Sequence, residues 1–181
     1  AVKLASRAVV LDVSSLLCRL RQVTDQRKAR GKRYPLEVIL SFVILAKMCG
    51  ADNLLAVTEW VRSHIALLVQ ALSLKRAQAP HQSTYSRVLG YAFDEVELQQ
   101  VLSAYVLDLP DVGNSAVLAI DGKTLRGTIP AGQMRGRHLL AAYLANEGVV
   151  LRQIEVPDKD GELSAAPELL EAIDLRGKIV T

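Results

Sequence analysis

The chain has 181 residues, of which half are hydrophobic and 23% are charged. This composition excludes a disordered protein and suffices for one or two domains with hydrophobic cores. The formal net charge of +3 permits nucleic acid as a partner but is too small to indicate one by itself. The longest apolar run, residues 38–48, is interrupted by Ser41 and Lys47. A membrane span needs about 20 apolar residues, so we expect no membrane partner.

The start of the chain and its two cysteines bear on the compartment. Charges at Lys3, Arg7 and Arg19 exclude the apolar core of a signal peptide. Cys18 and Cys49 lie among apolar neighbours, and no cysteine–histidine spacing typical of a zinc site is present. We interpret both as buried thiols and expect a cytoplasmic location.

Residues 34–109 have the apolar spacing of helices. Pro35 suits the first position of a helix, and Gly50 ends the apolar pattern that follows it. Asp52 or Asn53 can cap the next helix. Further helices are predicted over residues 65–72, 82–91 and 94–107. The first 110 residues are therefore predicted to form an all-helical domain.

The helical pattern ends with a recognisable boundary. Asp94 and Glu97 have the spacing of a capping box at the start of the last predicted helix. Residues 110–115 then form a linker rich in Pro, Asp, Gly, Asn and Ser.

Strands replace helices after this linker. The short apolar run over residues 116–120 ends at Asp121 and Gly122, as expected for a buried strand followed by a turn. Further elements are predicted as strands over residues 138–145 and 149–156, a helix over 165–173 and a strand over 177–181. The order β–β–β–α–β predicts an α/β domain over residues 111–181, and the whole chain is predicted to be α+β.

Asp121 is the strongest candidate for a catalytic residue. An acid at the end of a buried strand is held by a rigid backbone, which suits a metal ligand. Mg²⁺ prefers hard oxygen ligands and takes one or two carboxylates with waters and phosphates. A second carboxylate on a neighbouring strand would let two metal ions bind the attacking and leaving oxygens of a phosphodiester. Lys123 and Arg126 follow closely and suit contacts with the DNA backbone.

Simpler interpretations of this segment stay open. An Asp-Gly pair after a strand is more often only a turn. A P-loop is excluded, because it needs Gly five residues before Gly122 and Val117 occupies that position. His138 opens a strand and could approach Asp121, although a lone histidine is more often structural.

Three acids between the last predicted strands are alternative metal ligands. A charged loop of this kind is usually only solvated. The three acids are Asp158, Asp160 and Glu162.

The densest basic run, residues 27–33, is a candidate DNA-binding segment. Arg30, Lys32 and Arg33 can neutralise DNA phosphates. The run can equally be a solvated hinge before the helix that follows.

A second candidate for DNA binding is the helix predicted over residues 82–91. Thr84, Tyr85 and Arg87 could place it on DNA in the manner of a helix-turn-helix protein. Packing explains its apolar residues equally well.

Several motifs occur together along the chain. Residues 121–127 read Asp-Gly-Lys-Thr-Leu-Arg-Gly. Further motifs lie at residues 31–36, 49–52, 59–60, 83–89, 167–170 and 174–177. Taken in chain order, they resemble the motifs of the H-repeat-associated transposases, a group of DDE insertion-sequence transposases. The number of motifs makes the resemblance specific.

The resemblance implies a helical N-terminal domain followed by an RNase H-like catalytic fold that uses Mg²⁺ and acts on insertion-sequence ends. Asp121 matches the first of three catalytic acids. The second acid ends the fourth strand, here residues 178–181, where the sequence stops, and the third is a Glu further downstream. One of the three is thus present. His81 stands where the family more often has Ser, and residues 159–162 keep only a Lys and a Glu of the family pattern.

Two classes of function follow. The first is a truncated DDE transposase whose complete relatives cleave and transfer DNA strands; the isolated chain is then expected to be inactive, and its being an enzyme stays open. The alternative is a non-catalytic DNA-binding or interaction module, or a decayed transposase remnant. A truncated sheet leaves apolar surface and an unpaired edge, which favours a homo-oligomer. No feature indicates a small-molecule substrate.

Overall fold

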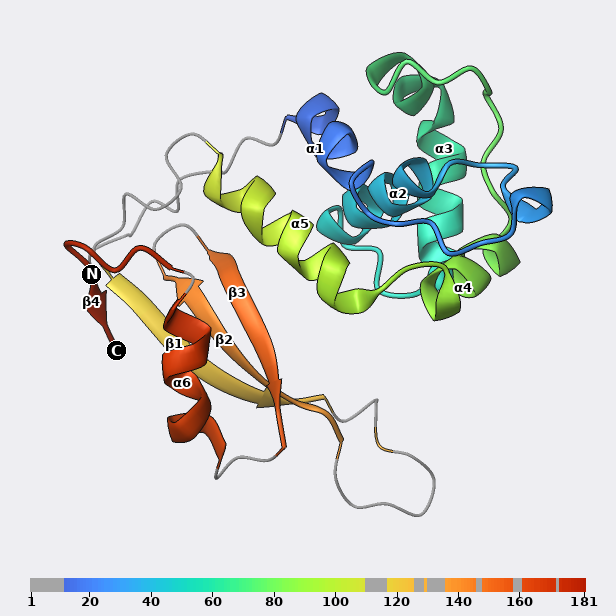
Figure 1. The fold of residues 1–181 in the computed structure, drawn as a ribbon. Coiled ribbons are helices and arrows are strands. Elements are labelled where there is room, and N and C mark those ends of the chain that lie inside the picture. Colours follow the sequence, from blue (N-terminus) through green and yellow to red (C-terminus); the bar gives the residue numbers. More distant parts are fainter. Residues whose placement is uncertain are drawn as a thin grey trace. The chain divides into compact units, whose positions relative to one another are not determined.

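The computed structural model in Figure 1 describes residues 12–109, 117–125, 129, 136–145, 148–157, 161–171 and 173–181. Contacts between residues divide the chain into two compact units, one formed by Leu11–Tyr105 and the other including Val106–Thr181. The first unit is helical, and the second contains a four-stranded sheet with one helix. The prediction of an α+β chain, helical first and then rich in strands, is confirmed.

The helical elements in chain order are α1 Val13–Leu20, the 3₁₀ helix η1 Ala29–Gly31, α2 Leu36–Met48, α3 Leu54–Ala71, α4 Gln82–Tyr91 and α5 Glu95–Leu107. Three of the predicted helices correspond to α2, α4 and α5, and the helix predicted after the Asp52 or Asn53 cap corresponds to the first part of α3. The separate helix predicted over residues 65–72 is wrong, because α3 runs without a break through this region and contains neither Gly nor Pro. Helix α1 was not predicted.

Local sequence signals explain most of the helix ends. Gly50 follows α2 with φ at +91°, a conformation that favours glycine. Asn53 caps α3 by accepting a hydrogen bond from the amide of Ala56 at 2.9 Å. His81 caps α4, since its Nδ1 accepts from the amide of Ser83 at 3.2 Å. The histidine thus takes over the role that a Ser usually has at a helix start.

The start of α5 differs from the predicted capping box. Asp94 Oδ1 accepts from the amides of Val96 and Glu97, as a cap should. The Glu97 carboxylate does not return to Asp94. It accepts instead from the amide of Thr24 at 3.0 Å and from the Thr24 hydroxyl at 2.8 Å. Glu97 therefore connects α5 to the segment after α1, a tertiary contact in place of the local one.

The sheet has the strand order β3-β2-β1-β4. Its strands are β1 Val117–Thr124, β2 His138–Leu144, β3 Val149–Val156 and β4 Ile179–Val180, and α6 Glu162–Glu171 precedes β4. β1, β2 and β3 pair antiparallel, whereas β4 pairs parallel with β1. The predicted order β–β–β–α–β is confirmed. The predicted end of β1 at Asp121 is wrong, because pairing with β2 continues through Thr124 and leaves Asp121 inside the strand.

One face of the sheet and α6 form the core of the second unit. Leu118, Leu140 and Leu144 are each at most 1% exposed and pack with Leu169 of α6 and with Ile173. Figure 1 shows α6 lying across this face. Strand residues alternate between faces, so every second residue of β1 and β2 faces α6.

The exposure of the two cysteines corrects the prediction that both are buried. Cys18 and Cys49 are exposed, so the interpretation of both as buried thiols is wrong.

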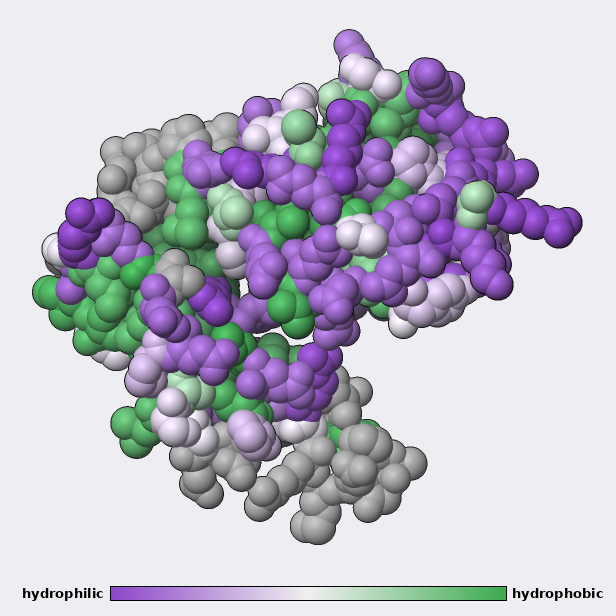
Figure 2. Space-filling view, viewed as in Figure 1, coloured by the Kyte–Doolittle hydropathy of each residue, from purple (hydrophilic) through white to green (hydrophobic). Residues whose placement is uncertain are grey.

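Ile179 and Val180 of the edge strand β4 are 60% and 39% exposed, and Leu163 of α6 is 90% exposed. Hydrophobic residues, green in Figure 2, are visible where these elements lie. None of the helices in the described residues is long and apolar enough to cross a bilayer.

Candidate functional site

Asp121 lies in the middle of β1, opposite Ala141 of β2, and its side chain is exposed. The next residue, Gly122, faces the side chain of Glu162 on α6. Because successive strand residues point to opposite faces, Asp121 points to the face that α6 leaves uncovered. The carboxylate is thus held by a strand with a neighbour on each side.

Of the two basic residues predicted beside Asp121, the structure places one. Lys123 lies two residues further along β1, on the same face, and is exposed. Within the described part of the chain it forms no ion pair. Arg126 lies outside the described residues. Asp121 and Lys123 therefore present one negative and one positive group side by side on an accessible face.

Asp121 belongs to no cluster of three or more possible metal ligands within the described residues. No group of three or more His, Cys, Asp or Glu that could hold a metal ion occurs there. Asp158 and Asp160 lie outside the described residues. One carboxylate with waters does not make a two-metal centre, so the described residues fit at most one ligand of the Mg²⁺ site that was predicted.

His138 does not approach Asp121, and this alternative is wrong. His138 is 5% exposed and its Nε2 lies 2.6 Å from Oε1 of Glu162. Its Nδ1 lies 2.7 Å from the hydroxyl of Thr124, its partner across the β1–β2 pair. All three residues are on the α6 face. The contact with His138 also accounts for Glu162, which was an alternative metal ligand in the sequence analysis. This acid connects α6 to the sheet and does not lie on the face of Asp121.

Gly122 is part of the same arrangement. A Cβ atom added there would collide with the Glu162 carboxylate. That carboxylate is the end of a flexible side chain, so it can move aside, but only by changing its contact with His138. The glycine of the Asp-Gly pair is therefore needed for the approach of α6 and not for a turn.

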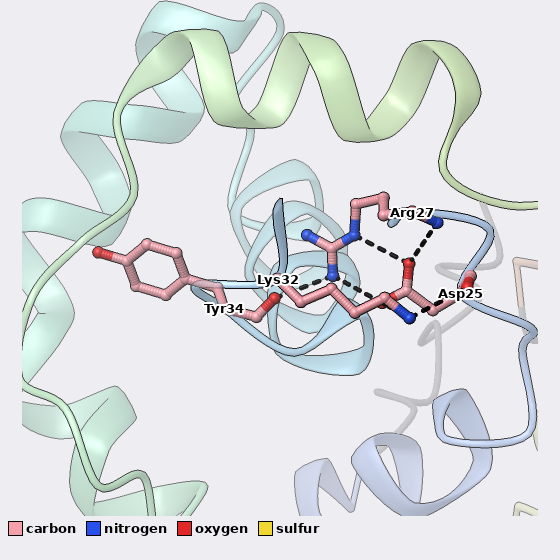
Figure 3. A network of polar contacts seen from close by, with 4 residues as sticks. All are labelled: Asp25, Arg27, Lys32 and Tyr34. Atoms are coloured by element: carbon pink, nitrogen blue, oxygen red, sulfur yellow. Dashed lines mark hydrogen bonds and ion pairs between the residues drawn. The ribbon is translucent and has the colours of Figure 1, made fainter. Parts of the chain in front are cut away.

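The basic run of residues 27–33 is ordered around Asp25 (Figure 3). Arg27 donates from Nε and Nη2 to the two carboxylate oxygens of Asp25, each at 2.9 Å, and from Nη2 to the carbonyl of Tyr34. Lys32 Nζ lies 3.4 Å from Asp25 Oδ2. These bonds close the loop on itself and leave the Arg27 side chain 9% exposed. The other cations of the run are exposed, so a solvated hinge stays an open prediction for them.

The electrostatics of the loop follow from these contacts. Hydrogen bonds from Arg27 lower the pKa of Asp25 below its ordinary value, with Lys32 adding to the effect. Asp25 is therefore ionised at neutral pH and offsets the charge of Arg27, whose side chain is only 9% exposed. Lys32 is in part neutralised too, which makes it a weaker candidate for DNA than the sequence indicated.

Two of the predicted DNA-binding residues come together in the helical unit. Arg33 and Arg87 line one groove of about 1010 Å³. Arg30 is exposed but does not line it. Tyr85 is fully buried, so the interpretation in which it contacts DNA from α4 is wrong, while Thr84 lines the groove.

Sequence reasoning did not identify Arg62 of α3, which lines the same groove. Arg62 and Ile65 are three residues apart on one helical face, a spacing that is visible in the sequence. The sequence does not tell which other element this face meets.

Both units of the chain are similar to known proteins: a family model covers most of the helical unit, and curated relatives match nearly the whole chain. Residues 17–106 match the family model described as DDE_Tnp_1-associated. "Putative transposase YncI" of Escherichia coli O157:H7 is 26% identical over 94% of this chain and 44% of its own length. "H repeat-associated putative transposase YhhI" of Escherichia coli K12 is 27% identical over 94% of this chain and 45% of its own length.

A third relative comes from a different genus. "Uncharacterized protein in dhlA 3'region" of Xanthobacter autotrophicus is 30% identical over 88% of this chain and 54% of its own length. The chain thus spans about half the length of these curated relatives or less. No solved structure matches. Residues 17–106 thus match the DDE_Tnp_1-associated family model, and nearly the whole chain is similar to proteins named as putative transposases, among them an H repeat-associated one.

Proposed function

We propose that the chain is the front part of a DDE transposase, in which Asp121 is the first of three acids that bind Mg²⁺ for cleavage and transfer of DNA strands. The observation that carries this is the position of Asp121, an exposed carboxylate on β1 with strands on both sides. The names of the relatives support transposition as the process.

The strand connections support a partial RNase H-like domain. Three antiparallel strands are followed by α6 and then by β4, which pairs parallel with β1. This order has β1 between β2 and β4. We propose that an acid just after β4 would lie beside Asp121 of β1. A site assembled from neighbouring strands is what two-metal chemistry requires.

Basic residues of both units are proposed to hold the DNA. Lys123 is on the face of Asp121 and is proposed to position a phosphate there, with Arg126 after it. In the helical unit, the proposed contacts are made by Arg30, Lys32, Arg33 and Arg87. Exposed guanidinium groups are suited to phosphate oxygens, which they bind with two parallel hydrogen bonds.

The proposal assigns this chain one metal ligand and no complete centre. When bound, Mg²⁺ activates the attacking water and stabilises the charge on the phosphate. The remaining ligands are proposed to lie in the part of the relatives that this sequence does not match. The isolated chain should then neither cleave nor join DNA.

The test uses the parent protein and the isolated chain side by side. In the parent, Asp121→Asn should abolish cleavage of insertion-sequence ends in Mg²⁺ or Mn²⁺ and leave DNA binding intact. Glu171→Gln, an exposed acid on α6, is the matched control and should stay active. Cleavage by the isolated chain that disappears in Asp121→Ala would refute the ligand count and show that other acids in this sequence serve.

A non-catalytic DNA-binding or interaction module is the second candidate, and a decayed transposase remnant is its variant. The lack of a three-residue metal group in the described part of the chain favours this candidate for the isolated chain. DNA binding without cleavage in the parent protein would establish it.

A further inference from the structure

The groove of the helical unit has an unusual electrostatic balance. Five of its sixteen lining residues are Lys or Arg, and none is Asp or Glu. Asp25 offsets the charge of Arg27, which leaves four cations, namely Lys28, Arg33, Arg62 and Arg87, all exposed. In the described part of the chain none of these four forms an ion pair with an acidic side chain. Clustered cations without counter-charges repel one another, and they are typical of a surface that binds an anion.

The cations come from elements that are distant in sequence. Lys28 and Arg33 belong to the loop that Asp25 orders, Arg62 to α3 and Arg87 to α4. Arg87 is oriented by a hydrogen bond from its Nε to the carbonyl of Ser83 at 3.1 Å. A ligand that meets all four must extend through the groove, so several linked phosphates fit better than one.

The shape and the non-polar lining narrow the ligand further. The groove measures about 1010 Å³, which is at the upper end of the range of roughly 300–1,000 Å³ typical of small-molecule pockets. Ile65 and Val88 give it apolar walls, and Tyr91 lines it with a side chain that is 63% exposed. A duplex is read by a convex element inserted into its major groove. A hollow with cations, apolar walls and an exposed aromatic ring is instead typical of sites for unpaired strands, whose bases stack on the ring.

We infer that this groove binds unpaired DNA, with Lys28, Arg33, Arg62 and Arg87 on the phosphates and Tyr91 beneath a base. The inference rests on the proposed function in taking DNA as the partner, and it adds the form of the DNA and the site. None of the four relevant side chains belongs to the proposed metal site.

The experiment measures fluorescence anisotropy of the whole chain with a labelled single-stranded DNA oligonucleotide, a hairpin duplex of the same sequence and the corresponding single-stranded RNA, over a salt series. The single strand of DNA should bind most tightly. Arg62→Gln with Arg87→Gln should weaken binding and flatten the salt slope by about 0.7 for each lost phosphate contact. Lys47→Gln, an exposed cation outside the groove, is the matched control and should change little.

Tyr91 provides a readout that charge does not affect. Tyr91→Ala should weaken binding of the single strand about fivefold or more at an unchanged salt slope, and Tyr91→Phe should retain binding because the ring remains. Thermal unfolding checks that each variant is folded. Thr84→Ser is a conservative substitution in the lining of the same groove.

Tighter binding of the duplex or of RNA would overturn the assignment to unpaired DNA. Binding that is unchanged in the Arg62 and Arg87 variants would overturn the groove as the site, without touching the proposed role of Asp121. Failure of all three nucleic acids to bind would count against DNA as a partner of this unit and thus against both proposals.

Discussion

The carboxylate of Glu162 lies 2.6 Å from Nε2 of His138, on the face of the sheet opposite to Asp121. The histidine is buried, and its other ring nitrogen is held by Thr124. The two residues thus join the start of α6 to the start of β2 directly behind the proposed ligand. This contact supports the strand that carries Asp121 without belonging to the metal site.

Gly122→Ala should destabilise the second unit by about 1–3 kcal/mol, because the new methyl group must displace the carboxylate that holds His138. In a Glu162→Ala background the same substitution should cost much less, since the collision is removed. Hydrogen exchange of β1 and β2 amides measures both effects in one double-mutant cycle. Equal costs in the two backgrounds would show that Glu162 does not occupy the space over Gly122.

Asp25→Asn should change how stability depends on pH. Hydrogen bonds from Arg27 lower the pKa of Asp25 in the folded state, so this group contributes stability above its unfolded pKa of about 3.9. That contribution is lost as pH falls through the folded pKa. The free energy of unfolding of the helical unit, followed by the fluorescence of Trp60, should decline as the pH falls below the unfolded pKa of this carboxyl. The decline should be shallower in Asp25→Asn, and parallel curves would refute a role for this carboxylate.

Glu97→Ala should lower the stability of the helical unit by about 1 kcal/mol or more, because two hydrogen bonds to Thr24 are lost. Thr24→Val removes the hydroxyl bond alone and should cost less. Urea unfolding followed by circular dichroism compares the two. Gln100→Ala on the same helix is the control for the change in helix propensity. If Glu97 acted only as a local cap, Thr24→Val would have no effect.

Short-range patterns predicted most elements correctly, for physical reasons. Gly50 and Asn53 act on residues next to them in the chain, so the C-terminal end of α2 and the start of α3 could be predicted from the sequence. β2 and β3 follow from apolar runs separated by Gly148, whose φ is +68°. Period-two alternation also makes the opposite orientations of Asp121 and Gly122 predictable once the strand is known to continue.

Contacts between distant residues were not predictable from these patterns. Glu97 has the spacing of a capping box, yet Thr24, 73 residues earlier in the chain, binds its carboxylate. Glu162 meets His138, which lies 24 residues earlier in the chain, because α6 packs on β2. Arg62 enters the groove only because α3 packs beside α4. In each case the pairing depends on tertiary packing, which a one-dimensional pattern does not contain.

The register of β4 determines which residue after Thr181 in the parent reading frame lies beside Asp121. β4 pairs parallel with β1 through Val117 with Ile179 and Leu118 with Val180. The ladder continues, since Thr181 donates its amide to the carbonyl of Leu118 at 3.0 Å and accepts from the amide of Ile120 at 2.8 Å.

Extending this register by one residue at a time brings the second residue after Thr181 beside Asp121. In a parallel pair, partners in register point to the same face. An acid at that position would therefore share the face of Asp121 at a separation suited to bridging metal ions, and we expect the frame to encode Asp there and a Glu on a helix further on. Sequencing the DNA beyond the Thr181 codon tests this. An open frame with both acids would support the transposase proposal, and the same acids behind a stop or a frameshift would indicate a decayed copy. If no acid occurs at this position or next to it in any frame, Asp121 has no partner from β4, and the non-catalytic module becomes the better account.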